Sequence, residues 1–160
     1  MNKKTIILTS IISVFLIVIC TLVGTYSVII NVTEEDGVDK IVNEITIRDL
    51  LTDDNGTYNN TYYTVKNELN ITNEEAELLI ESPPLNDTLK TVLDTIVDYK
   101  LHNNSGARLT NEQLYNMIVN SVNKTTTIEE NLKTKVINKA NVYKQDISDF
   151  VYDIEVTRIG

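Results

Sequence analysis

The chain has 160 residues, enough for one ordinary domain, and its formal net charge is −9, from 14 basic and 23 acidic residues. This acidity argues against nucleic acid as a partner, because binding to a phosphate backbone depends on Lys and Arg. The only cysteine, Cys20, excludes an intramolecular disulfide, and the only histidine, His102, excludes a zinc site with two histidines from one chain.

The N-terminal segment is predicted to anchor the chain in a membrane. No charged residue occurs from Thr5 to Thr33, and this run exceeds the ~20 residues that a helix needs to span a bilayer. Lys3 and Lys4 precede the run, a bias that keeps the N-terminus in the cytoplasm. We therefore expect residues 1–33 to form a cytoplasmic stub and a single-pass signal anchor, with residues 34–160 outside the cell membrane.

Alternatives to a retained anchor have weaker support. A cleaved signal peptide needs small residues at its exit, where Thr25-Tyr26-Ser27 is a poor match. Lipid attachment at Cys20 is disfavoured because the preceding Ile19 is not small. Small residues recur at four-residue spacing within the segment, which favours self-association of two membrane helices as much as a lone anchor: Thr5, Thr9, Ser13, Thr21 and Thr25.

Residues 34–160 hold all 23 acidic residues and 12 of the 14 basic ones, so the external domain is strongly acidic. Its first predicted element is an amphipathic helical turn or two, on the apolar residues between Val38 and Ile45. The stretch Asp53-Asp54-Asn55-Gly56 then indicates a turn. A further helix is predicted from Tyr58 to Leu69.

One phrase occurs twice, as ITNEEAELLI from Ile71 and as LTNEQLYNMI from Leu109. In each copy a threonine, Thr72 or Thr110, is followed three positions later by Glu75 or Gln113. This spacing is typical of a capping box, in which the two side chains satisfy each other's backbone N–H groups. The phrase therefore marks the start of two helices, and its acidic residues need no catalytic explanation.

Another helix is predicted from Ser82, as N-cap with Pro83 at the first position, through about Leu101. Its apolar residues recur at three- and four-residue steps: Leu85, Leu89, Val92, Leu93, Ile96 and Val97. The helix that begins at Thr110 should fray at Lys124 to Thr126.

The longest helix outside the membrane is predicted from Ile128 to Ile154, a length of ~40 Å. Thr127 and Glu130 have the spacing of a third capping box. The apolar seam of this helix alternates steps of four and three: Leu132, Val136, Ala140, Tyr143, Ile147, Phe150 or Val151, and Ile154.

No pattern in the sequence predicts a catalytic, cofactor-binding or metal-binding residue. A calcium loop aligned on Gly56 would need glutamate where Tyr62 stands. His102 lies in a polar stretch with no nucleophile motif elsewhere, so we interpret it as a solvated loop residue. Tyr58, Tyr62 and Tyr63 suit either a binding surface or the core.

The start MNKK, the Ile-rich apolar segment and the Asn-, Ile- and Lys-rich remainder with TNEQLYNMI-type helix starts together resemble uncharacterised membrane proteins of AT-rich Gram-positive bacteria. This resemblance implies a location at the cell membrane and no functional residues. The predicted fold class is all-α, with an N-terminal transmembrane helix followed by an external bundle of four to six helices.

The function expected from these features is a binding or scaffolding module that acts on a protein partner at the cell surface. The alternative is a cell-envelope hydrolase that uses Asp and Glu carboxylates. Expected partners are the membrane, through the anchor, and a protein or a second copy of the chain. No nucleic acid and no small-molecule cofactor are expected.

Overall fold

The computed structural model describes residues 29–42, 44–102, 108–153 and 155–159. Residues 1–28, which include most of the predicted anchor, lie outside the described residues. In chain order, the elements are β1 (Ile29–Glu35), β2 (Val38–Ile41), α2 (Ile47–Leu51), α3 (Asn60–Leu69), α4 (Asn73–Ile80), α5 (Pro83–Leu101), α6 (Asn111–Lys124), α7 (Glu130–Val142), α8 (Ile147–Val151) and β3 (Glu155–Arg158). Among the described residues, no helix combines the length and apolarity required to cross a membrane.

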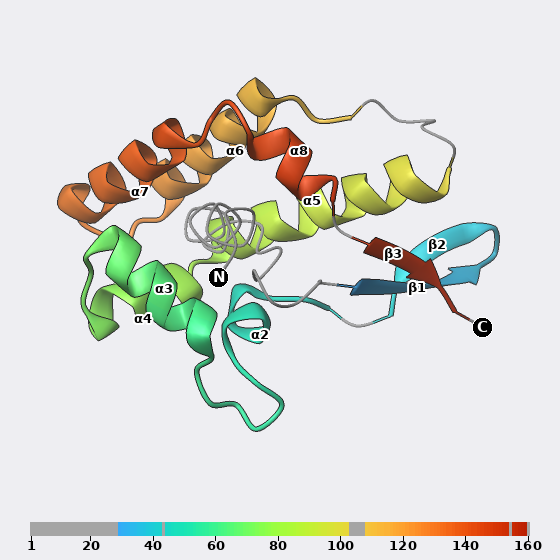
Figure 1. Cartoon of the computed structure of the whole chain (residues 1–160), viewed down its shortest axis with the longest axis horizontal. Coiled ribbons are helices and arrows are strands. Elements are labelled where there is room, and N and C mark those ends of the chain that lie inside the picture. Colours follow the sequence, from blue (N-terminus) through green and yellow to red (C-terminus); the bar gives the residue numbers. More distant parts are fainter. Residues whose placement is uncertain (1–28, 43, 103–107, 154, 160) are drawn as a thin grey trace, which may run out of the picture.

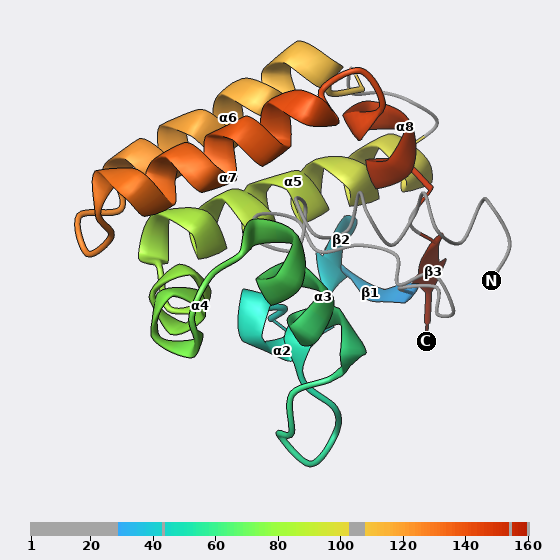
Figure 2. The ribbon, with the colours of Figure 1, turned by 60° about the vertical axis from the view of Figure 1, so that its left-hand side comes forward.

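Helix α5 runs through the middle of the molecule (Figure 1). Figure 2 shows α6 and α7 side by side along one side of α5, and the small sheet on the other side near the C-terminal half of α5. Helix α4 also packs on α5, and α3 contacts α7. The stripe of α5 predicted to be apolar is buried along its whole length, from Leu85 to Val97. This helix is therefore the centre of the core.

The prediction of an all-α fold is wrong, because the domain contains a three-stranded mixed sheet in the order β2-β1-β3. β1 pairs antiparallel with β2, placing Val32 opposite Ile41, and parallel with β3, placing Ile30 opposite Val156. Ile30 and Val32 are fully buried. Residues Ile29 to Thr33 were predicted to continue the membrane helix, but they belong to strand β1.

Local sequence explains the hairpin between β1 and β2. Asp36 and Gly37 both have positive φ, 53° and 79°, as required at the two central residues of a type I′ turn. β-branched residues alternate before the turn, so that Ile30 and Val32 share the inner face. The region predicted to be helical from Val38 therefore begins as strand β2, and the first helix, α2, begins only at Ile47.

Both capping boxes in the repeated phrase are confirmed. The Thr72 hydroxyl accepts from the Glu75 N–H at 3.1 Å, and the Thr110 hydroxyl accepts from the Gln113 N–H at 3.1 Å. Ser82 caps α5 as predicted, accepting from the Leu85 N–H at 3.3 Å. The third box is wrong: α7 begins at Glu130, and its N-cap residue makes no side-chain hydrogen bond.

The single helix predicted from Ile128 to Ile154 is also wrong, because this stretch forms two separate helices, α7 and α8. The break lies at Tyr143 to Asp146, where the side chain of Asn111 from α6 intervenes. Its amide nitrogen donates to the Gln145 carbonyl, and its oxygen accepts from the Ser148 N–H, both at 2.7 Å. Asn111 thereby satisfies backbone groups that a continuous helix would have paired internally.

Candidate functional site

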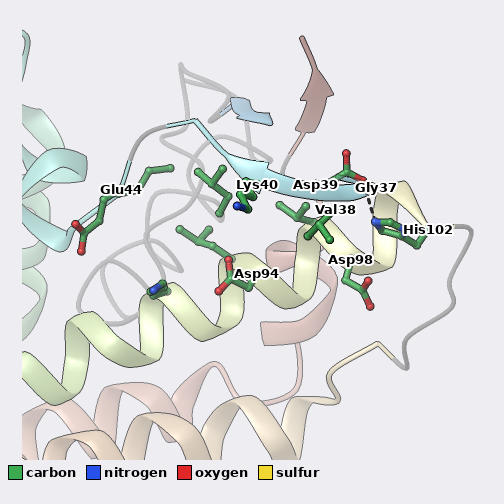
Figure 3. A pocket seen from close by; sticks show the side chains of 13 residues that line it. Gly37, Val38, Asp39, Lys40, Glu44, Asp94, Asp98 and His102 are labelled. Atoms are coloured by element: carbon green, nitrogen blue, oxygen red, sulfur yellow. Dashed lines mark ion pairs between the residues drawn. The ribbon is translucent and has the colours of Figure 1, made fainter. Parts of the chain in front are cut away.

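Asp39 on β2 joins three distant parts of the chain. Its carboxylate accepts two hydrogen bonds from Arg158 of β3, from Nε at 2.8 Å and from Nη2 at 2.7 Å. Nε2 of His102, at the end of α5, lies 2.8 Å from Oδ2 of Asp39 (Figure 3). The Asp39 side chain is only 2% exposed. This cluster fixes the end of the sheet to the end of α5.

The cluster also sets the charge of Asp39. The hydrogen bonds and positive charge of Arg158 lower the pKa of the Asp39 carboxyl below its ordinary value, and His102 adds to this effect. In turn, Asp39 raises the pKa of the Arg158 guanidinium. The interpretation of His102 as a solvated loop residue is only partly right: its side chain is 37% exposed, but it is the C-cap residue of α5 and contacts a buried carboxylate.

Beside this cluster, a groove of about 760 Å³ lies between β2 and α5 (Figure 3). This volume is within the range of sites that hold small molecules or peptide side chains. Its apolar lining comes from Ile41 and Ile45 on one side and from the buried Leu93 and Val97 of α5 on the other. The groove therefore lies directly over the core, although Leu93 and Val97 at its floor are only 2% and 4% exposed.

Charged side chains border the groove along α5. Lys90, Asp94, Asp98 and His102 are spaced four residues apart, so they follow one another along one face of the helix. Glu44 lies on the opposite border, ahead of α2. Within the described part of the chain, no ion pair involves Glu44, Asp94 or Asp98. The border is thus predominantly acidic.

The backbone of β2 provides the remaining wall. β2 lies at the edge of the sheet, and five consecutive residues from Gly37 to Ile41 line the groove. The Val42 N–H donates to the Asn31 carbonyl, and backbone groups alternate in direction along an antiparallel ladder. The N–H and C=O of Lys40 therefore point toward β1, and those of Asp39 and Ile41 point away from it. Because β1 is the only strand paired with β2 among the described residues, this register leaves the backbone N–H and C=O groups of Asp39 and Ile41 without a ladder partner.

These features suit binding better than hydrolysis. A glycosidase-type pair needs one carboxyl kept protonated by burial and a second one that stays ionised. Asp94 and Asp98 are both exposed. In the regions that the structure describes, no three His, Cys, Asp or Glu side chains are placed to hold a metal ion.

Tyr58, Tyr62 and Tyr63, which suited either a binding surface or the core, are divided between the two. The ring of Tyr62 is buried and stacks on Tyr58 with centroids 3.7 Å apart, whereas Tyr63 is 51% exposed. Burial raises the pKa of the Tyr62 hydroxyl. The Asp53 to Gly56 stretch is a turn, in which the Asp53 carboxylate accepts from the Asn55 and Thr57 N–H groups.

Sequence reasoning missed the groove entirely. One available signal was the four-residue spacing of Lys90, Asp94, Asp98 and His102 beside the apolar stripe of α5. The other was Asp36-Gly37, a typical hairpin turn sequence that would have placed an edge strand after it.

Lys40 and Glu44 come close to the charged residues of α5 only because the sheet packs on that helix. No local sequence motif therefore predicts the groove. Comparison with known proteins adds no template for this site: no family model, curated protein or solved structure matches the chain.

Proposed function

We propose that this protein is a membrane-anchored module that binds a protein partner at the outer surface of the cell membrane, and that the groove between β2 and α5 is its binding site. The observation that carries the proposal is the groove itself: about 760 Å³ of accessible space over the core residues Leu93 and Val97. An opening of this kind, with a charged border, is typical of a ligand or peptide site.

The location rests on the N-terminal sequence. The uncharged stretch from Thr5 to Val28, which precedes β1, is still longer than the ~20 residues of a membrane-spanning helix. Lys3 and Lys4 before it favour a cytoplasmic N-terminus and an external domain. The acidic charge of residues 34–160 keeps such a domain away from anionic lipid head groups and leaves its groove open to proteins.

Photo-cross-linking tests the proposal in cells that make the protein. A photoreactive p-benzoylphenylalanine is placed at Glu44 or Lys90, both exposed on the border of the groove. The control position is Asp87, which is exposed on the same helix but lines a separate hollow shared with α6. We expect one protein, identified by mass spectrometry, to be cross-linked from the groove positions and not from Asp87.

Two charge variants provide the matched control for that experiment. Asp94→Lys with Asp98→Lys should abolish the cross-link, while Asp54→Lys with Asp87→Lys makes the same change in net charge away from the groove and should preserve it. Equal cross-linking from Asp87 and from the groove, or an unchanged product in the Asp94 and Asp98 variant, would refute the groove as the site.

A further inference from the structure

The outer edge of β2 borders the groove, and it has the geometry of an edge strand that can pair with a further strand. Asp39 and Ile41 each direct one N–H and one C=O away from β1. A further strand would lie ~4.8 Å from β2, which places it within the groove, above α5. Its alternate side chains would then point toward Ile41, Leu93 and Val97.

The charge of the groove indicates which peptide fits. Glu44, Asp94 and Asp98 border the space without ion pairs to other described residues, whereas Lys40 is already paired with Glu35 at 3.1 Å. Asp39 is likewise matched by Arg158. The charges left to meet a ligand are therefore mainly negative, with Lys90 at one end of the α5 border. Complementarity selects a basic peptide.

We propose that the groove binds an extended, basic segment of the partner protein, which adds to the outer edge of β2 as a fourth strand and inserts alternate apolar side chains over α5. This inference rests on the proposed function and specifies its ligand. Main-chain hydrogen bonds to Asp39 and Ile41 supply part of the affinity, and the apolar floor and acidic border supply the selectivity.

A second copy of the chain is a poorer occupant. Pairing two β2 edges would bring two acidic domains together, with Asp94 and Asp98 of each copy facing the other. β2 is also short and carries charged side chains, features by which natural proteins prevent edge-to-edge pairing between copies. A basic partner segment avoids the repulsion between two acidic domains, because its charge is opposite to that of the groove border.

The test uses the full chain in detergent micelles and fluorescence anisotropy with a labelled peptide of sequence KVKVKVK. Its acidic counterpart, EVEVEVE, has the same apolar pattern. Two further versions carry N-methyl groups on alternate amides, one version on the lysines and the other on the valines. Because a strand turns alternate N–H groups to opposite edges, only one of these versions blocks pairing with β2.

We expect KVKVKVK to bind and EVEVEVE not to bind. One N-methylated version should lose affinity by about tenfold or more, and the other should stay within about threefold of the parent, as the loss of a few backbone hydrogen bonds dictates. Equal effects of the two versions, or binding of EVEVEVE as tight as that of KVKVKVK, would overturn the inference.

Charge variants separate this site from general attraction to an acidic protein. Asp94→Lys with Asp98→Lys should weaken KVKVKVK binding by about tenfold, and Asp54→Lys with Asp87→Lys by no more than about twofold. If both double variants weakened peptide binding equally, net charge alone would attract the peptide. That result would overturn the groove as the peptide site.

The outcomes also separate this inference from the proposed function. If a partner is cross-linked only from the groove but the two N-methylated peptides bind equally well, the proposed function is supported and pairing with β2 is refuted. Cross-links between two copies of the chain from a photoreactive residue at Lys40 would identify a second copy as the occupant and would overturn the inference. No groove-dependent cross-link at all refutes the proposed function.

Discussion

At the scale of single residues, the predictions that held are those made within one helical turn. Thr72 and Glu75, like Thr110 and Gln113, lie three positions apart, so the sequence alone brings their groups within hydrogen-bonding distance. Thr127 has the same spacing from Glu130 but makes no cap, because α7 begins at Glu130, two residues later than that box requires. The spacing predicts that a cap is possible, and the path of the chain decides whether it forms.

Removal of either confirmed cap should destabilise the domain. Thr72→Ala and Thr110→Ala are each expected to lower the free energy of unfolding by ~1 kcal/mol, since each leaves a helix N–H group without its acceptor. Thr127→Ala is the matched control and should change stability very little. Chemical denaturation of the three variants measures these effects, and an equal loss in all three would contradict the role of the caps.

Asp39 could not be recognised from the sequence, because its partner Arg158 is 119 positions away. Its lowered pKa gives a pH dependence with a definite sign. The Asp39 carboxylate stabilises the fold above the pKa of an unfolded aspartate, ~3.9, and this contribution is lost as the pH falls through the lower folded value.

Asp39→Asn should therefore be less stable than the parent at neutral pH, and the difference should shrink at acidic pH below ~4. Denaturation midpoints across pH 2 to 7 provide the measurement. Asp54→Asn, at an exposed turn position, is the control and should follow the parent at every pH. A difference between Asp39→Asn and the parent that is independent of pH would show that the carboxylate charge is not what stabilises the cluster.

At the scale of elements, periodicity predicted burial better than it predicted helix length. Of the predicted seam, Leu132, Val136, Ala140, Ile147 and Val151 are buried, Tyr143 is partly buried, and Ile154 lies outside the described residues. The helix nevertheless ends at Val142, because Asn111 bonds the backbone at Gln145 and Ser148. A hydrophobic period indicates which residues face the core. It cannot predict that a polar side chain of another helix will bind the backbone and end the helix.

Large-to-small changes in the seam should be costly on both sides of the break. Leu132→Ala and Ile147→Ala are each expected to lower the free energy of unfolding by ~2 to 5 kcal/mol, as for other buried aliphatic side chains. Val142→Ala is the control, because Val142 is 67% exposed, and it should have little effect. If Leu132→Ala and Ile147→Ala keep the stability of the parent, the burial of the seam is not what holds α7 and α8 in place.

The strands were missed for two reasons: residues up to Thr33 belong to the uncharged run that predicted a membrane segment, and the apolar residues between Val38 and Ile45 also fit a short amphipathic helix. Positive φ at Asp36 and Gly37 gives a direct test of the hairpin that results. Gly37→Val should cost ~1 to 2 kcal/mol, since a β-branched residue is strained in the left-handed region. Asp36→Gly, in the same turn, should be tolerated, because glycine adopts that conformation freely. Equal stability of the two variants would contradict this turn.

At the scale of the whole molecule, the sequence predicted a helical domain but not how its ends are joined. Pairing of β1 with β3 connects residues from opposite ends of the described chain, and such contacts leave no local pattern. The groove has the same origin, since it exists only where the sheet and α5 diverge. Local elements were therefore partly predictable, and the candidate site, which depends on long-range packing, was not.

The anchor proposal predicts an intact N-terminus in the mature protein. Mass spectrometry of protein extracted from membranes should give the mass of the chain with its first residues present, because Thr25-Tyr26-Ser27 is a poor cleavage site. Protein released without detergent is the control fraction and should contain little of the chain. A mature start near Ser27 would contradict a retained anchor.

The parallel pairing of β1 with β3 also constrains the order of folding. β1 and β2 are synthesised first, but the inner strand lacks one neighbour until Glu155 to Arg158 have been made. During that interval the hairpin exposes the buried side chains Ile30 and Val32 and an open strand edge, and contacts so distant in sequence form slowly. The nascent domain thus passes through a stage in which it is most prone to aggregate, and completion of its last strand ends that vulnerability.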